Sequence, residues 1–314
     1  DLVIFGELLA VAAVTMCLMF IMADMGRPDR GLHLFMRFNW PISVLTWDVI
    51  VLNGYLALNL HICGYLIWCA YNERKPGKAF YIPFVFLAIF WAFSIHTVTA
   101  FLYSGLGGRP FWNSAVLAPR FLASAFAAGP AFLVLTLLVI NRFTKYDVPR
   151  AALQTLRGII TVALTINMFL LGCEVFTEFY TDSTHAASAH YLFEGLGGKH
   201  ALVPWIWTAI ALNTFALVVL YSPFKRRVVF YAPACGAMIV GIWIEKGMGL
   251  IVPGFIPTPL GEVFEYVPTL NETLVCFGIW AAGLLLFTIL VRVTIPVLSG
   301  ELTKNKLYST DSFS

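Results

Sequence analysis

The chain has 314 residues, of which 60% are hydrophobic and only 12% are charged, and its mean hydropathy is +0.82. A soluble domain of this length would need about twice that charged fraction to cover its surface, so the composition excludes an ordinary soluble protein. A net charge of +3 is too small to indicate nucleic-acid binding. The basic residues are better explained as signals of membrane topology.

Eight apolar stretches are long enough to cross a membrane as helices, which takes about 20 residues each. Their hydrophobic residues are continuous rather than alternating, which favours helices over a β-barrel. We therefore expect an all-α, polytopic transmembrane helix bundle, with one helical domain over residues 1–298 and a polar cytoplasmic tail over 299–314. The expected spans are Leu2–Met22, Leu45–Tyr71, Phe80–Tyr103, Ala115–Ile140, Arg157–Tyr180, Ala201–Tyr221, Val228–Ile244 and Thr273–Leu298.

The first apolar stretch starts directly after Asp1, without an initiator Met or a basic segment. This pattern is not typical of a signal peptide. It predicts that further helices lie upstream, which would give roughly ten spans in the full-length protein.

If the chain crosses the membrane eight times, its basic residues are divided unequally between the two sides of the membrane. One set of loops and the C-terminal tail carry 13 Lys and Arg residues, and the other set carries seven. The positive-inside rule places the richer set, and therefore the C-terminus, in the cytoplasm of an inner-membrane protein. The outer loops are also long and rich in Pro, Gly, His and aromatic residues, which predicts that a partner docks there or that they cover a site.

Ionisable residues inside the spans gather near the outer side, as judged from about 1.5 Å of rise per residue. Charged groups are costly in a membrane, so they are candidates for function. The inner half holds only Glu7 and His61, with Asn59 nearby. These residues could form a proton path, but interhelical hydrogen bonding is the simpler explanation. The outer set is Asp48, His96, Arg120, Glu174, Glu178, Glu245 and Glu272.

Members of the outer set differ in depth. Glu174 and Glu178 share one helix face, and two carboxylates this close need a cation or a proton, for which Arg120 is the obvious partner. Asp48 and Glu245, like Glu272, are as easily explained as helix-end groups in the headgroup region.

Quinone chemistry would use such a site. A quinone needs an apolar slot, hydrogen-bond partners for its two oxygens and a group that exchanges protons, for which histidine and buried carboxylates are suited. The third span and its loop add aromatic side chains, including Tyr103.

Resident metal centres are not indicated. None of the six cysteines forms a CxxC pair, so neither an iron–sulfur cluster nor a zinc site is expected. The only histidines within the spans, His61 and His96, lie at different depths and cannot sandwich a haem iron.

Several motifs resemble the NrfD/PsrC family of integral membrane subunits over essentially the whole chain. The landmarks are Asp24-Met-Gly-Arg-Pro28 after the first span and Asn39-Trp-Pro-Ile-Ser43 before the second, then Ser94-Ile-His-Thr-Val98 and Phe176-Thr-Glu-Phe-Tyr180. They are most similar to the ten-helix branch, which includes the membrane subunit of the Dsr sulfur-metabolism complex.

The resemblance implies a subunit without redox centres that passes electrons between menaquinone, or another quinone, and a ferredoxin-like iron–sulfur subunit on the outer face of a larger respiratory complex. It assigns proton handling to His96 and Glu178. The residue pattern itself adds Asp48, Tyr103, Arg120 and Glu174 as the quinone-binding side chains. Some branches carry an Asp shortly after the histidine, where this chain has Phe101-Leu-Tyr103, and that departure counts against proton pumping.

Two alternatives stay open. A secondary transporter would place charges along a path and break helices at mid-membrane, whereas here the polar groups lie to one side. A proton-translocating subunit would use Glu7 and His61, although the inner polar set is sparse.

Overall fold

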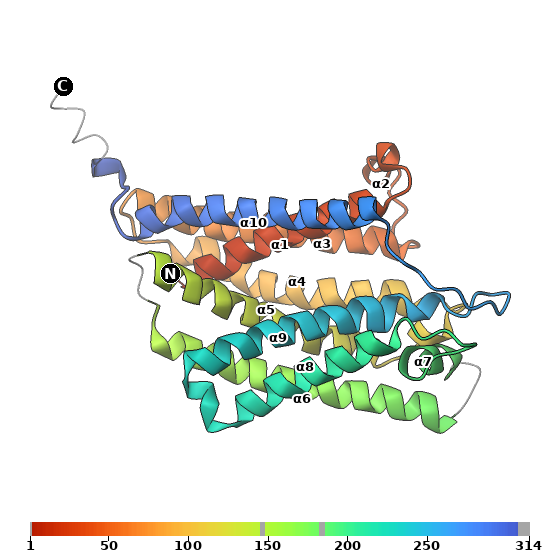
Figure 1. Ribbon diagram of the computed structural model, residues 1–314. Helices are drawn as coiled ribbons and strands as arrows, with labels where there is room; N and C mark the ends of the chain where they lie inside the picture. Colours follow the sequence, from red (N-terminus) through yellow and green to blue (C-terminus); the bar gives the residue numbers. More distant parts are fainter. Residues whose placement is uncertain (1, 145–147, 182–185, 307–314) are drawn as a thin grey trace. The chain divides into compact units, whose positions relative to one another are not determined.

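The computed structural model describes residues 2–144, 148–181 and 186–306, so Lys145, His185 and the tail from residue 307 onward lie outside the described residues. Within these ranges eight helices are long and apolar enough to cross a membrane, which confirms the predicted all-α fold and its eight spans. In Figure 1 the main helices are α1 (Leu2–Asp24), α2 (His33–Met36), α3 (Val44–Tyr71), α4 (Lys78–Ser104), α5 (Leu117–Phe143), α6 (Arg150–Thr181), α7 (Ala186–Phe193), α8 (Val203–Tyr221), α9 (Val228–Lys246) and α10 (Leu270–Leu298).

Most predicted bounds lie within three residues of the helix ends, and two differ by more. Helix α6 begins at Arg150 instead of Arg157, because its first two turns contain charged and polar residues and hydropathy detects only the apolar part of a helix. The span that begins with α9 continues through a π turn, η4 (Gly247–Ile251), and a 3-10 turn, η5 (Pro253–Phe255), so it reaches Phe255 instead of ending at Ile244. Glu245 looked like the start of a loop, but its side chain is buried.

The chain divides into two compact units. Residues up to Val98, together with those from Pro268 onward, form the first unit, and Thr99–Val267 form the second. The expectation of one domain over residues 1–298 stays a prediction.

In the first unit, α1 packs against α3 and α10. Helix α3 also packs against α4, where Leu58 and Ile62 meet Ala88. Helix α10 begins with a capping box: the Thr269 hydroxyl accepts from the Glu272 N–H, and the Glu272 carboxylate accepts from the Thr269 N–H. Glu272 is therefore a helix cap, as its simpler explanation predicted.

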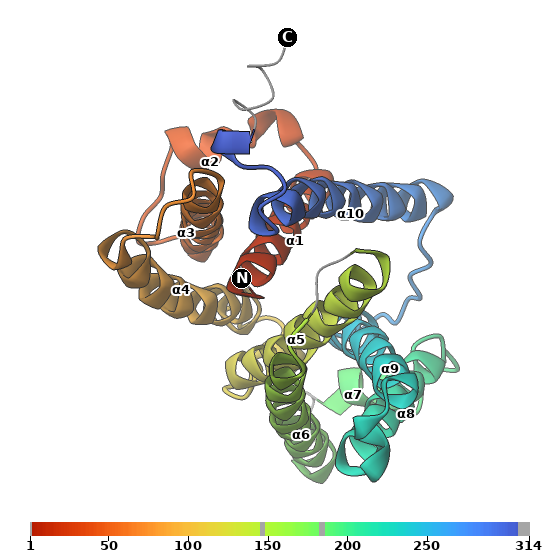
Figure 2. The ribbon, with the colours of Figure 1, turned by 90° about the vertical axis from the view of Figure 1, so that its left-hand side faces the viewer.

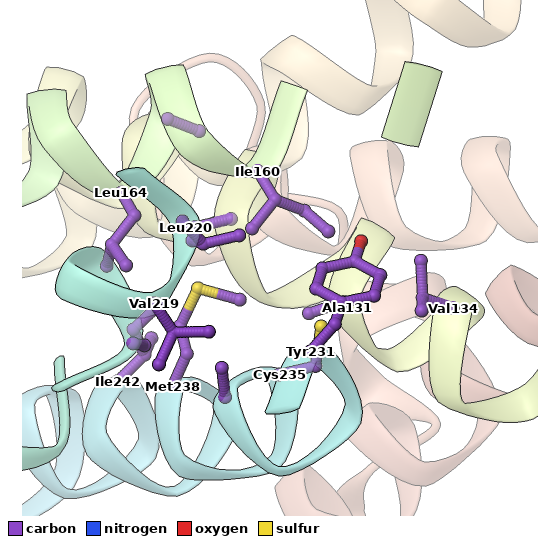
Figure 3. Packing of buried hydrophobic residues seen from close by; sticks show 14 residues of the cluster. Ala131, Val134, Ile160, Leu164, Val219, Leu220, Tyr231, Cys235, Met238 and Ile242 are labelled. Carbon is purple, nitrogen blue, oxygen red and sulfur yellow. The ribbon is translucent and has the colours of Figure 1, made fainter. Parts of the chain in front are cut away.

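The second unit is built on a four-helix bundle. Helices α5, α6, α8 and α9 contact one another in a closed ring, and Figure 2 views them nearly end-on. Their shared core contains many small side chains, which let helices approach closely in a membrane. Figure 3 shows part of this core, in which Ala131 and Val134 of α5 lie near Tyr231 and Cys235 of α9.

Short elements cover one end of this bundle. Helix α7, η2 (Pro110–Trp112) and η5 pack over it around the buried Trp112, whose Nε1 donates to the Leu250 carbonyl at 2.8 Å. Gly254 is required here, because a Cβ at this position would overlap the ring of Trp112. These short elements share one buried apolar cluster with Leu117 of α5 and Ile206 of α8.

Candidate functional site

A network of buried polar side chains crosses the second unit. At its centre, the fully buried carboxylate of Glu245 on α9 accepts four hydrogen bonds. Its Oε1 accepts from Arg120 Nη2 at 3.0 Å and Lys246 Nζ at 3.1 Å, and its Oε2 accepts from Asn167 Nδ2 at 3.0 Å and Asn213 Nδ2 at 3.2 Å. All four helices of the bundle therefore meet at one carboxylate.

Arg120 connects this carboxylate to a second one. It lies in the first turns of α5, and its Nη1 pairs with Oε2 of Glu174 on α6. The positive charges of Arg120 and Lys246 therefore balance the negative charges of Glu174 and Glu245. Arg120, Glu174 and Glu245 are all buried. Such charges are tolerated in a membrane only when they pair inside the protein, so the helices must keep this register.

Close packing of α9 against α8 holds the network in place. Gly241 lies one turn before Glu245, and a Cβ at Gly241 would come within 2.5 Å of Asn213 Oδ1 and 3.2 Å of the Ala209 carbonyl oxygen. Only glycine at this position therefore leaves room for the Asn213 amide to reach Glu245.

A small cavity lies beside the network. Arg120, Glu174 and Glu178 line it together with Phe111, Leu171 and other apolar side chains of α6, α7 and α8. The cavity volume is about 10 Å³, which is enough for one water molecule but too small for a quinone ring.

A larger groove lies next to this cavity, and the two share one wall. It has a volume of about 420 Å³ and is mostly apolar, with Phe179, Phe193 and Trp207 among its lining residues. Phe193 packs edge-to-face against both of the other rings. Leu171, Val175 and Phe193 line the groove and the cavity alike, so a single layer of side chains separates them.

The structure brings together three of the residues that the sequence singled out as candidates for a quinone site. Arg120, Glu174 and Glu178 share the cavity. Tyr103 lies in the same unit, where its ring contacts Phe121 of α5 at 6.2 Å between centroids. Lys246 Nζ lies 5.4 Å from the centroid of the same Phe121 ring.

The other predicted site residues belong to the first unit. His96 is half-buried on α4, and Asp48 is buried on α3. His61 is exposed, and its Nε2 lies 3.1 Å from the Phe80 carbonyl oxygen. Glu7 on α1 is half-buried, within electrostatic range of α3. Glu7 and His61 have no interaction with each other in the described part of the chain.

Sequence reasoning missed four residues of the network: Asn167, Asn213, Gly241 and Lys246. Isolated asparagines in apolar spans are a usable signal, because they commonly bond neighbouring helices. Glu245 was named in the outer set but was not taken as a site residue. Among the residues that the structure describes, no group of three or more His, Cys, Asp or Glu side chains could hold a metal ion.

One end of the second unit also contains a buried phenol. Tyr191 of α7 is fully buried, and burial, followed by the negative charge of Glu265, raises its pKa. The phenol therefore stays protonated at neutral pH and serves as a packing group beneath the cover of the bundle.

The chain is similar to one protein family and to membrane subunits of two oxidoreductases. The family described as "Polysulphide reductase, NrfD" matches residues 1–256. The "Hdr-like menaquinol oxidoreductase integral membrane subunit" of Archaeoglobus fulgidus is 22% identical over 301 residues, which cover 91% of this chain and 73% of that protein. A protein of Halobacterium salinarum that is named as a membrane subunit of dimethyl sulfoxide reductase is 24% identical over 272 residues, 80% of this chain. The match spans 60% of that second relative's length.

Proposed function

The chain belongs to the polysulphide reductase NrfD family and is a multi-pass integral membrane protein, and we propose that it is the quinone-interacting subunit of a respiratory oxidoreductase complex. In this proposal it passes electrons between menaquinol, or another quinone, and a ferredoxin-like iron–sulfur subunit at the outer face of the cytoplasmic membrane. The C-terminus would be cytoplasmic. The name of the Archaeoglobus relative supports a menaquinol-linked role.

The observation that carries the proposal is the shared wall between the apolar groove and the charged cavity. The groove's volume of about 420 Å³ lies in the range of small-molecule sites, and its aromatic side chains suit a flat ring. The cavity behind it holds three ionisable groups. A quinone has an apolar ring that suits the groove and two oxygens that exchange protons, which suit the ionisable groups of the cavity.

Each residue then has a distinct task. A bound quinone exchanges two electrons and two protons. Glu178, which lines the cavity, would accept or return a proton. Arg120 balances Glu174 and orients it. Leu171, Val175 and Phe193 would have to shift by rotamer changes for the two spaces to join, because the cavity alone is too small for a ring.

The sequence adds three residues to the proposal. His96 would handle protons, and its support is the family motif of residues 94–98. Asp48 and Tyr103 are proposed as quinone-binding residues from their places near the outer ends of their spans, and Tyr103 lies in the second unit.

A second candidate function is proton translocation. The buried network of Arg120, Glu174 and Glu245 favours it, because ionisable groups that cross a bundle form proton relays in many membrane proteins. Asn167 and Asn213 each have an Oδ1 atom without a donor among the described residues, so the network can take further donors.

The test is quinone occupancy and quinol-linked electron transfer in the purified complex. Lipophilic molecules extracted from the wild type, Glu178→Gln and His96→Ala are identified by mass spectrometry, and quinol oxidation is followed in parallel. We expect bound menaquinone in the wild type and a loss of turnover of at least about 10²-fold in Glu178→Gln, as for a missing proton-transfer group.

The matched control is Glu262→Gln, which removes an exposed carboxylate of the same unit. Normal turnover in both Glu178→Gln and His96→Ala would contradict the assignment. Absence of quinone, together with proton uptake that depends on Glu245, would favour the second candidate.

A further inference from the structure

A cationic pocket lies in the first unit, formed by the segment that joins α1 to α3 and by the first turn of α3. Its volume is about 400 Å³. Three arginines and a histidine line it, and no acidic side chain is among its described lining residues. The full lining is Met25, Arg27, Arg30, His33, Leu34, Arg37, Asn39, Ser43, Leu45 and Thr46.

Two of these arginines have no counterion among the residues that the structure describes. Arg27 is paired with Asp29 through two hydrogen bonds of 3.0 and 2.8 Å. Arg30 and Arg37 make no side-chain ion pair or hydrogen bond within the described part of the chain. Their charges are therefore available to an anion, and guanidinium groups bind phosphate and carboxylate oxygens in pairs.

The start of α3 borders the same pocket. Ser43 is the N-cap, but its hydroxyl makes no capping bond, and Leu45 and Thr46 of the first turn line the pocket. The unsatisfied N–H groups of a helix start carry partial positive charge, which adds to that of the arginines.

Packing holds this segment in shape. Gly31 is buried, and a Cβ there would lie 3.1 Å from the Pro28 carbonyl oxygen and 3.3 Å from the Met22 sulfur of α1. Farther along, Trp47 Nε1 donates to the Pro41 carbonyl at 2.8 Å. The pocket is therefore a folded feature and not only a run of basic residues.

The segment that forms the pocket also exposes large apolar side chains that do not line it. Large hydrophobic and aromatic groups lie beside arginines at the end of a span, which is typical of a segment that sits in the membrane interface. These exposed residues are Leu32, Phe35, Met36, Phe38, Trp40 and Ile42.

We propose that this pocket binds the anionic headgroup of a membrane phospholipid, with Arg30 and Arg37 contacting the phosphate and the exposed apolar side chains of the segment contacting the acyl chains. The positive charge of the pocket favours an anionic headgroup, and the exposed apolar side chains favour a lipid over a soluble anion. This inference stands apart from the quinone proposal, because the pocket lies within residues 25–46 and shares no residue with the groove.

The experiment is native mass spectrometry of the purified complex that contains this chain, after mild delipidation in a defined mixture of phosphatidylglycerol and phosphatidylcholine, with inorganic phosphate as competitor. The wild type should retain phosphatidylglycerol selectively. Arg30→Gln with Arg37→Gln should reduce that retention by at least about tenfold, since each lost charge-assisted bond is worth more than a factor of ten. Arg226→Gln with Arg227→Gln, which removes two basic residues from another loop, is the matched control.

Three results would overturn the proposal. One is equal retention of phosphatidylglycerol by the wild type and the Arg30/Arg37 variant. Another is complete displacement of the lipid by inorganic phosphate, which would assign the pocket to a soluble anion. The third is unselective lipid retention together with loss of a partner subunit in the variant, which would assign the arginines to protein docking. Thermal unfolding of each variant separates a specific loss from misfolding.

Discussion

Arg120 and Glu245 join α5 to α9 at 3.0 Å, although 125 positions separate them in the chain. The contact is one of two ion pairs that Arg120 makes, the other being with Glu174 of α6. A single guanidinium therefore connects three of the four bundle helices, and the stability of the bundle should depend on its partners.

Glu245→Gln tests this dependence. The substitution keeps the shape of the side chain but leaves Arg120 and Lys246 with one carboxylate in place of two. Breaking a buried charge pair costs about 3–5 kcal/mol. We expect a loss of that order in denaturant unfolding of the purified protein, against little change for Glu262→Gln, which is exposed. A loss below about 0.5 kcal/mol would show that the network does not hold the bundle together.

Gly241→Ala tests the approach of α9 to α8. The added methyl would push Asn213 away from Glu245, and overpacking of this kind costs about 1–3 kcal/mol. Gly236→Ala on the same helix meets nothing within 4 Å and should be neutral or stabilising, because alanine favours helices. Similar unfolding midpoints for the two variants would contradict the close packing.

Gly172→Phe tests the groove. Gly172 lines it from α6, and a Cβ there meets no neighbour within 4 Å, so a phenyl ring would fill the space without disturbing the helix. The apparent KM for quinol should rise by at least about tenfold, equivalent to ~1.4 kcal/mol. Gly158→Phe is the control, since Gly158 is equally uncrowded on α6 but lies outside the groove. Unchanged quinol kinetics in Gly172→Phe would remove the groove from the proposal.

Thr269→Ala tests the assignment of Glu272 to structure. Losing the N-cap hydroxyl of α10 should lower stability by about 1 kcal/mol and leave quinol kinetics unchanged. Thr273→Ala, which removes only a hydroxyl bonded within the helix, should have a smaller effect. A kinetic defect in Thr269→Ala without loss of stability would return Glu272 to the candidate functional residues.

Span positions could be predicted from the sequence because each depends on a local property, a run of apolar residues of sufficient length. The end of the α9 span could not, since Glu245 looks like a surface residue until its partners from α5, α6 and α8 are known. A hydropathy profile scores a charged residue as if it faced water, whereas side chains of the other helices neutralise the charge of Glu245 inside the bundle.

The candidate site was predictable only where it depends on residues that are close in the sequence. The spacing of Glu174 and Glu178 and the need for a cation identified Arg120, and the ion pair between Arg120 and Glu174 is present. The contributions of Asn167 and Asn213 depend on the rotation of α6 and α8 about their axes, which the sequence does not determine. The roles of His96, Asp48 and Glu178 in quinone chemistry stay predictions.

The order of the helices along the chain has a consequence for membrane insertion. Glu245 and Lys246 end α9 inside a span that continues to Phe255, and a charged residue within an inserting span is costly, by up to about 2.5–3.5 kcal/mol at its centre. The other partners of Glu245 lie on α5, α6 and α8, all of which precede α9 in the chain. The last helix of the bundle to be synthesised is therefore the one that needs the other three already in place, so its arrival in the bilayer completes the assembly.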